Sequence, residues 1–408
     1  MGGTTAKLCL IDQFRPQTAR KFEIALAARF IKGSGMPVRI PVIEMIEIGA
    51  GGGSIASVDR LGRLQVGPES AGSDPGPAAF GAGGAHPTVT DADVVLGLID
   101  PDRFAEGRLK IDRQAAQAAL STGIGQALDL NAAGAATGVS EIVDENMAGA
   151  GRLHAVESGK DLTSRLMIAF GGNGPLHATR VARRAQVDRI LIPRDPGVRS
   201  AVGFLYAPVS FEIIRSRYAT LETLDPDDLN AFFDAMIQEA ETVVRAGVPT
   251  GDLIRCRHAF MRYKGQGHEI EVSLPDRPLE PGDATELRQQ FEQEYSRQFS
   301  RAVPGMTIEI LNWALVVSSE PQALITAPET PSKRTAQTTE TRQILCEVTG
   351  EWRSAAIHDR NVLAPDDHID GPALIVEPQT TTYVSADFTA HVDGGGNIWL
   401  TRRKEGAS

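Results

Sequence analysis

The sequence predicts an α/β fold at the start of the chain, followed by a mixed α+β region and a mostly β C-terminal region. An apolar run at 165–170, read as a buried strand, leads into a glycine turn and a helix-like segment, and a second short apolar run follows at 188–193. This alternation of strand, turn, helix and strand is typical of α/β proteins. After about residue 215 the pattern changes, because longer helix-like segments now stand between hairpin-like runs.

In the first part, glycine and proline separate short strand-like runs from alanine-rich helices. The runs SIASVD and LGRLQVG predict a hairpin around the turn at Asp59–Gly62. Helical spacing of alanines predicts helices at 112–121 and 140–158, and Asp91 is a candidate N-cap. Residues 20–30 fit either a strand or a helix.

The later part of the chain has its own sequence of elements. Helices are predicted at 224–247 and 284–299, with an aspartate-rich start to the first. Between them, a hairpin turns near Lys264–Gly267, and a long strand is predicted at 306–319.

These patterns divide the chain into four parts. Residues 1–215 form the α/β part, residues 216–325 an α+β domain, and residues 342–408 a small β-rich region. The polar residues 326–341 between the last two have the composition of a linker.

Composition excludes several classes of protein. The 408 residues carry a formal net charge of −11, which argues against nucleic acid or an anionic membrane surface as the main partner. The three cysteines, Cys9, Cys256 and Cys346, are far apart, so they predict neither a disulfide framework nor a CxxC metal site. The chain has no run of 18 apolar residues and no basic segment followed by an apolar one, so the expected compartment is the cytoplasm.

The first candidate motif is the glycine–threonine turn at the start of the chain. Gly2 and Gly3 would let backbone N–H groups approach a phosphate, and the hydroxyls of Thr4 and Thr5 would add donors or reach a metal. Lys7 could also contact a phosphate, but it equally fits a solvent-exposed residue of a strand. The alternative for the whole turn is a plain hairpin.

A second motif follows the strand at 165–170. Gly171, Gly172, Asn173 and Gly174 form a glycine turn before a helix, a context that favours nucleotide contact at a helix N-terminus. His177 stands beside this turn and is a candidate ligand contact. The alternative is a tight turn that only packs a helix closely on a strand.

A third motif is the triplet Gly51, Gly52 and Gly53 in an apolar setting. It predicts either a flexible stretch or a nest of backbone amides that binds an anion, and we favour the nest. The glycine- and proline-rich residues 70–84 fit a ligand loop or a rigid structural loop, and the sequence does not decide between them.

The remaining chemistry-bearing residues give no catalytic or metal site. None of the eight histidines pairs with an acid or another histidine at metal-ligand spacing. No GxSxG elbow and no nucleophilic cysteine is evident. Catalytic residues therefore stay unassigned.

Taken together, several segments resemble the hydantoinase A/oxoprolinase family in the family's order along nearly the whole chain. They are MGGTTAK, KGSGMPVRIPVIEMIEIGAGGGSIA, SAGSDPGPAAFG, PTVTDADVVLG, AFGGNGPLHA and GPALIVEPQTTTYV. The resemblance implies an actin/sugar-kinase-like fold with α/β lobes around ATP, of which residues 1–215 would be part. It matches Gly2 to Thr5 with the second phosphate loop, and Gly171, Gly172 and Gly174 with the adenosine-side turn.

The resemblance also implies an activity. Members couple ATP to ring opening of 5-oxoproline or hydantoins, so we expect a subunit of an ATP-dependent cyclic-amide hydrolase that supplies part of the ATP site. The alternative is an ATP-dependent carboxylase of ketones such as acetone or acetophenone. Mg²⁺ or another divalent metal would accompany ATP, and a hydantoinase B-type subunit would complete a hetero-oligomer.

The sequence departs from the family pattern in three places. Members carry an acidic residue directly before the Met-Gly-Gly of this phosphate loop, but here Met1 is the first residue. Members also carry an earlier lobe with a first Gly-Gly-Thr loop, and this sequence lacks it. The family's DPGPAC has Ala79 in place of its cysteine. A fragment, a split subunit or a truncated, catalytically incompetent scaffold is therefore a further expectation.

Overall fold

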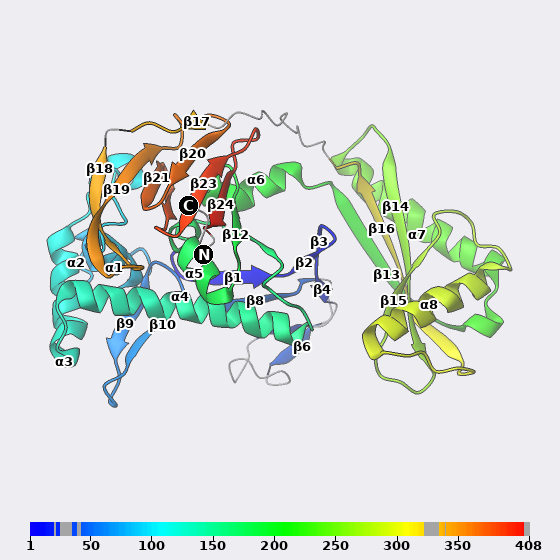
Figure 1. Cartoon of the computed structure of the whole chain (residues 1–408). Helices are drawn as coiled ribbons and strands as arrows, with labels where there is room; N and C mark the ends of the chain where they lie inside the picture. Colours follow the sequence, from blue (N-terminus) through cyan, green and yellow to red (C-terminus); the bar gives the residue numbers. More distant parts are fainter. Residues whose placement is uncertain (20–21, 25–34, 39–41, 322–333, 339, 404–408) are drawn as a thin grey trace. The chain divides into compact units, whose positions relative to one another are not determined.

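The computed structural model describes residues 1–19, 22–24, 35–38, 42–321, 334–338 and 340–403 (Figure 1). It divides into two compact units. The first joins Met1–Val202 to Ile325–Ser408, and the second is Gly203–Leu324. The stretch expected to be a linker, 326–341, lies partly outside the described residues. Among the described residues, no helix has the length and apolarity that crossing a membrane requires.

The main sheet of the first unit combines strands from both ends of that unit. Its order is β11 (Leu166–Ile168), β12 (Arg189–Ile192), β24 (Ile398–Arg402), β23 (Phe388–Val392), β20 (Asp367–Asp370) and β17 (Arg334–Thr335). The strands β11 and β12 run parallel, as a strand–helix–strand unit requires, and β24 pairs antiparallel with β12. The C-terminal β-rich region therefore continues the sheet that the first half begins.

A second, four-stranded sheet comes wholly from the C-terminal region. Its order is β18 (Thr341–Cys346), β19 (Glu351–Asp359), β21 (Ala373–Glu377) and β22 (Thr380–Val384). The strands β21 and β22 form a tight hairpin in which Glu377 pairs with Thr380.

The described part of the first unit contains six α-helices, the last of which continues into the second unit. They are α1 (Val89–Val95), α2 (Arg113–Leu120), α3 (Gln126–Leu128), α4 (Ala132–Glu157), α5 (Gly174–Ala185) and α6 (Arg199–Tyr206). The N-cap of α1 is Thr88, not Asp91: Asp91 stands three residues later and completes a capping box. Asn131 caps α4 through its side chain.

Short strands fill the start of the chain. They are β1 (Ala6–Cys9), β2 (Ile11–Asp12), β3 (Arg15–Pro16), β4 (Thr18–Ala19), β5 (Phe22–Ile24), β6 (Met36–Val38), β7 (Val42–Ile43), β8 (Met45–Ile48), β9 (Ser54–Val58) and β10 (Leu64–Ser70). The predicted hairpin at Asp59–Gly62 is confirmed: β9 pairs with β10, and the Asp59 carboxylate accepts from the N–H groups of Leu61 and Arg63. The ambiguous segment 20–30 lies mostly outside the described residues.

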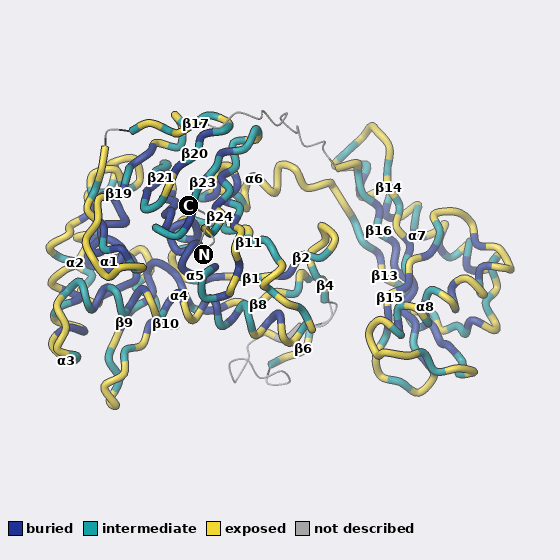
Figure 2. Tube along the Cα trace, viewed as in Figure 1, coloured by how far each residue is buried: buried dark blue, intermediate teal, exposed yellow. Residues whose placement is uncertain are grey.

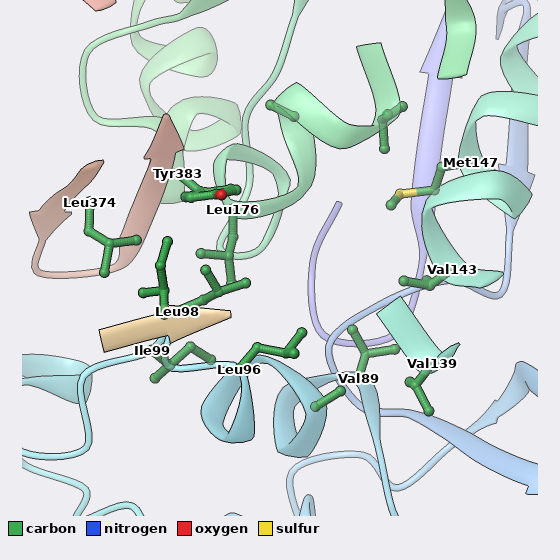
Figure 3. Close-up of a cluster of buried hydrophobic side chains, with 14 of the residues drawn as sticks. Val89, Leu96, Leu98, Ile99, Val139, Val143, Met147, Leu176, Leu374 and Tyr383 are labelled. Atoms are coloured by element: carbon green, nitrogen blue, oxygen red, sulfur yellow. The ribbon is translucent and has the colours of Figure 1, made fainter. Parts of the chain in front are cut away.

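The core of the first unit lies between α1, α4, α5 and the hairpin β21–β22, as Figures 2 and 3 show. The helix α1 is buried along its whole length. Figure 3 labels Val89, Leu96, Leu98, Ile99, Val139, Val143, Met147, Leu176, Leu374 and Tyr383 of this cluster. One expectation is wrong: β11 is an edge strand and is only partly buried, with Ile168 45% exposed.

The second unit is a four-stranded antiparallel sheet with two helices. Its strands and helices are β13 (Ser210–Thr220), α7 (Pro226–Gly247), β14 (Leu253–Tyr263), β15 (Ile270–Leu274), α8 (Asp283–Phe299) and β16 (Ile308–Ser319). The predicted helices, hairpin and long strand are confirmed. Aromatic side chains form its centre, where Phe233 meets Trp313 and Tyr263 meets Phe291 edge to face.

Candidate functional site

Two of the three glycine motifs dock on each other through their backbones. The N–H of Gly52 donates to the carbonyl oxygen of Gly2 at 3.0 Å, and the N–H of Gly53 donates to that of Gly3 at 2.7 Å. A Cβ on Gly51 would lie 2.5 Å from the backbone of Gly3 and Thr4. Only glycine at position 51 permits this approach.

The third glycine motif joins the same cluster. The N–H groups of Asn173 and Gly174 both donate to the carbonyl oxygen of Met1 at 3.2 Å. Gly171 has a φ of +97°, and a Cβ there would collide with the same Met1 oxygen. Segments that are more than a hundred residues apart in the sequence therefore meet around the first residues of the chain.

The start of α1 holds these loops from behind. The N–H and Oγ1 of Thr90 both donate to the carbonyl oxygen of Gly52, at 2.7 and 2.9 Å. The side-chain amide of Asn173 also lies against Gly52, because a Cβ there would be 2.9 Å from its Nδ2. This Nδ2 is buried and has no hydrogen-bond partner in the part of the chain that the structure describes.

The glycine triplet does not form the expected nest. The N–H of Gly51 donates to Ser54 Oγ at 2.9 Å, and those of Gly52 and Gly53 are taken by Gly2 and Gly3. The three glycines are buried, so their amides face protein acceptors and not a ligand. They serve instead as a support that sets the position of Gly2 and Gly3.

The exposed parts of the cluster lie elsewhere. Gly3 and Thr4 are exposed, and so is Gly172 in the third motif. Lys7 also points to solvent: it lies in β1 opposite Glu47 of β8, and their charged atoms are 3.6 Å apart. Across the described residues, no group of three or more His, Cys, Asp or Glu side chains is arranged to hold a metal ion.

A cavity of about 270 Å³ opens next to the third glycine motif. Gly172, Asn173 and Leu176 form one wall, the β21–β22 turn forms a second, and the loop after α1 forms a third. Its lining residues are Ile99, Asp100, Arg103, Phe104, Ala105, Glu106, Arg108, Gly172, Asn173, Leu176, Val376, Glu377, Pro378, Gln379, Thr380 and Thr381.

The loop wall of this cavity is fixed by ion pairs to the second sheet. Asp100 pairs with Arg342, and Arg103 pairs with Glu340 at 2.8 Å. Ala105 and Glu106 both have positive φ, a costly backbone conformation for residues with a side chain. Both ion pairs hold the loop on the N-terminal side of this strained segment.

One carboxylate in the cavity wall is nearly buried. The side chain of Glu377 is 6% exposed and pairs with Arg360 at 3.3 Å. Burial raises the pKa of Glu377 to about 7, although Arg360 lowers it. Arg360 also donates to the carbonyl oxygens of Gly396 at 2.7 Å and Pro193 at 3.4 Å, so its guanidinium is fixed by the loops that adjoin β24 and β12 of the main sheet.

Behind the glycine turn, His177 lies in a buried charge cluster. Its Nδ1 is 2.7 Å from Asp144 Oδ1 and its Nε2 is 3.2 Å from Asp93 Oδ2. Arg180, one turn further along α5, has its Nε 2.8 Å from Asp144 Oδ2. We call Asp93, Asp144, His177 and Arg180 the buried charge cluster; each of the four is less than 5% exposed.

The charges within this cluster balance. Burial alone would lower the pKa of His177, but Asp93 and Asp144 raise it to about 9, so the ring is an imidazolium at neutral pH. Burial likewise opposes ionisation of Asp144, but Arg180 and His177 hold its pKa below the usual value. The sequence placed His177 beside the glycine turn; the structure turns its side chain away from the cavity and into the core.

Several of these residues were missed in the sequence. Asp144 stands on the same helical face as Val139, Val143 and Met147. A charged residue on an apolar helix face indicates a buried charge, and this pattern could have identified Asp144. Glu377 lies in the segment GPALIVEPQTTTYV that carried part of the resemblance, but no pattern within the segment singles it out.

Comparison with known proteins gives the family. The hydantoinase/oxoprolinase family model matches residues 1–213, and the model of the hydantoinase/oxoprolinase C-terminal domain matches residues 227–398. Caprolactamase subunit alpha of Pseudomonas jessenii is 30% identical over 89% of this chain and 53% of its own length. The acetophenone carboxylase gamma subunit of Aromatoleum aromaticum is 34% identical over 85% of this chain and 49% of its own length.

A solved structure extends the likeness to the fold. The crystal structure of ATP-dependent caprolactamase from Pseudomonas jessenii superposes with a TM-score of 0.79 at 27% identity, over 98% of this chain and 58% of that one. The chain thus spans about half the length of the curated relatives described here. By the two family models and these relatives, the chain belongs to the hydantoinase/oxoprolinase family.

Proposed function

We propose that this chain is a subunit of an ATP-dependent cyclic-amide hydrolase and that it supplies part of the ATP site. The observation that carries the proposal is the convergence of three glycine motifs beside a cavity. Glycine loops let backbone atoms approach phosphates closely, and a helix N-terminus next to them favours negative charge.

The residues present fit a nucleotide. The exposed backbone at Gly3 and the hydroxyl of Thr4 would meet phosphate, because a Cβ on Gly2 or Gly3 would touch no protein atom within 4 Å. Gly172 and the unpartnered amide of Asn173 lie between this loop and the cavity, which would take the nucleoside. The predicted roles of Gly171 and Gly174 become structural ones, since both are held against Met1.

When bound, ATP supplies a phosphoryl group that makes opening of a stable amide ring directional. Mg²⁺ would balance the phosphate charge. It typically keeps several waters and binds phosphates with few protein carboxylates, so it does not need a dedicated cluster of acids. The role of this chain is to bind and position the nucleotide.

The relatives support two reaction classes. Caprolactamase acts on a lactam, in line with a cyclic-amide hydrolase, and the acetophenone carboxylase subunit supports the ketone carboxylase as the second candidate. Both printed names describe subunits, so we propose a hetero-oligomer with a hydantoinase B-type partner.

The test uses the complete assembly of this chain with its partner subunit. Gly3→Val should fold normally, because a Cβ at position 3 meets no protein atom within 4 Å, but it should obstruct phosphate and weaken ATP binding by more than tenfold. Gly267→Val is the matched control, since position 267 is equally open and lies in the second unit.

Binding is measured by calorimetry and folding by thermal unfolding. Product formation is then followed with 5-oxoproline, hydantoin, and acetone or acetophenone with bicarbonate, each with and without ATP. ATP-dependent loss of the lactam or hydantoin supports the hydrolase, and carboxylation supports the second candidate. If the wild-type assembly binds no ATP, the chain acts as a non-catalytic scaffold and the proposal is wrong.

A further inference from the structure

The turn between β21 and β22 is locked against the third glycine motif. A Cβ on Gly197 would lie 2.5 Å from Gln379 Cβ, and a Cβ on Gly172 would lie 3.7 Å from the Gln379 carbonyl oxygen. The approach at Gly197 leaves no room for a side chain, and that at Gly172 is an ordinary van der Waals contact, so the turn packs directly on the loop that carries Gly172, with Glu377 two residues before Gln379. The cavity between them is therefore pre-formed.

Glu377 retains hydrogen-bonding capacity that the described protein does not use. A carboxylate offers about four acceptor positions. Within the described residues, the one side-chain partner of Glu377 is Arg360, and the Arg360 guanidinium is shared with the carbonyl oxygens of Gly396 and Pro193. A side chain that is only 6% exposed can satisfy little of the remainder with bulk water.

A hydroxyl next to Glu377 is buried and unsatisfied. Thr380 faces Glu377 across the hairpin and is 8% exposed. Its Oγ1 is buried and has no partner within the described part of the chain. A buried hydroxyl without a partner and a carboxylate with a single side-chain partner within the described residues thus stand together at one end of a cavity.

The rest of the cavity is suited to a flat, partly apolar group. Ile99 and Leu176 are buried in its walls, and Phe104 contributes an aromatic ring. A volume of about 270 Å³ is slightly below that of most ligand pockets, which span roughly 300–1,000 Å³, so the cavity fits one part of a larger ligand.

We infer that Glu377 is a specificity-determining residue for the proposed ATP site: its carboxylate accepts a hydrogen bond from a donor group of the nucleoside. That donor is a hydroxyl of the ribose or the exocyclic amine of the base. A buried acceptor that a ligand leaves unpaired costs free energy, so Glu377 selects against nucleotides without the donor. This inference rests on the proposed function.

The test compares Glu377→Gln and Glu377→Leu with Glu106→Gln in the assembly with the partner subunit. Glu106 lines the same cavity, but it is more exposed and is paired with Arg108. Calorimetry should show ATP binding weakened about tenfold to a hundredfold by Glu377→Leu, less by Glu377→Gln, and by less than twofold in the control. Thermal unfolding identifies any variant that fails to fold; because glutamine has the shape of glutamate, Glu377→Gln keeps the inference falsifiable.

Three analogues locate the donor. If a ribose hydroxyl is the donor, 2′-deoxy-ATP or 3′-deoxy-ATP should bind wild type about tenfold or more weakly than ATP, and Glu377→Leu should remove that difference. If the amine is the donor, purine riboside triphosphate should show the same pattern. Should every analogue be discriminated equally by wild type and by Glu377→Leu, the role of Glu377 is wrong while ATP binding stands. Absence of ATP binding by wild type overturns both.

Discussion

The two sides of the Gly171–Gly174 turn bury charge in opposite ways. Behind the turn, two carboxylates and two cations of the buried charge cluster neutralise one another within 4 Å, although Asp93 Oδ1, Asp144 Oδ2 and Arg180 Nε make no hydrogen bond within the described residues. In front of it, Glu377 has a single side-chain partner within the described residues and faces a cavity. Buried charge is costly unless it is paired. A cluster whose charges balance is therefore typical of a structural role, and a buried carboxylate with few partners beside a cavity is typical of a ligand site.

The largest effect is expected from His177→Leu. Removing the imidazolium leaves Asp93 and Asp144 buried with only Arg180 as cation, so the free energy of unfolding should fall by about 3–5 kcal/mol. Denaturant unfolding measures the loss, and the exposed His268 provides the control His268→Leu. A loss below 1 kcal/mol would mean that the cluster is not structural and that His177 is free to serve a ligand.

The pH dependence of stability follows from the same histidine. The pKa of His177 in the folded protein, about 9, exceeds its ordinary value of 6.5. Its stabilising contribution is therefore complete below about pH 6.5 and is lost as the pH rises through 9. This increase in the pKa of His177 corresponds to a contribution of about 3 kcal/mol to the free energy of unfolding. The melting temperature of wild type should fall between pH 7 and pH 9.5, and that of His177→Leu should fall less over this interval.

Gly51→Ala is expected to have an intermediate effect, this time on the support beneath the phosphate loop. Its Cβ would meet the backbone of Gly3 and Thr4, which cannot rotate away, so stability should fall by about 1–3 kcal/mol and ATP binding should weaken. Gly172→Ala is the comparison, because its nearest atom, the Gln379 oxygen, is at an ordinary contact distance of 3.7 Å. If both variants bind ATP like wild type, the glycine cluster does not position the nucleotide.

The smallest effect on stability belongs to Lys7→Gln. The pair Lys7–Glu47 is more than half exposed on both sides, and such pairs contribute below about 1 kcal/mol. Thermal unfolding should therefore not distinguish the variant. Its ATP affinity decides the open question about Lys7: a clear loss shows that the side chain leaves Glu47 for phosphate, and an unchanged affinity assigns it to the strand surface.

Local patterns predicted the elements well and their surroundings less well. The Asp59–Gly62 hairpin and the helices of the second unit are set by turn residues and by periodicity within a few residues. The exposure of β11 depends instead on its place at the edge of a sheet whose other strands include the last ones of the chain. No local pattern contains that information.

The same distinction holds for the site. The glycine motifs could be found in the sequence because a close approach of two backbone segments requires glycine, whichever segment is the partner. The direction of His177 could not be found that way, since it depends on Asp144 in α4 and on Asp93 in α1. Glu377 depends on Arg360 and on a cavity built from three distant segments.

The pairing of β12 with β24 has a consequence for synthesis of the protein. Ile192 lies opposite Ile398, roughly two hundred residues later, so the main sheet stays incomplete until β24 has been synthesised. Contacts between residues this far apart in sequence form slowly. Until then, the edge of β12 is open to wrong partners, and Arg360 lacks its acceptor on Gly396, which lies just before β24. The support of the Arg360 guanidinium, and through it of Glu377, is therefore completed only once β24 has been made.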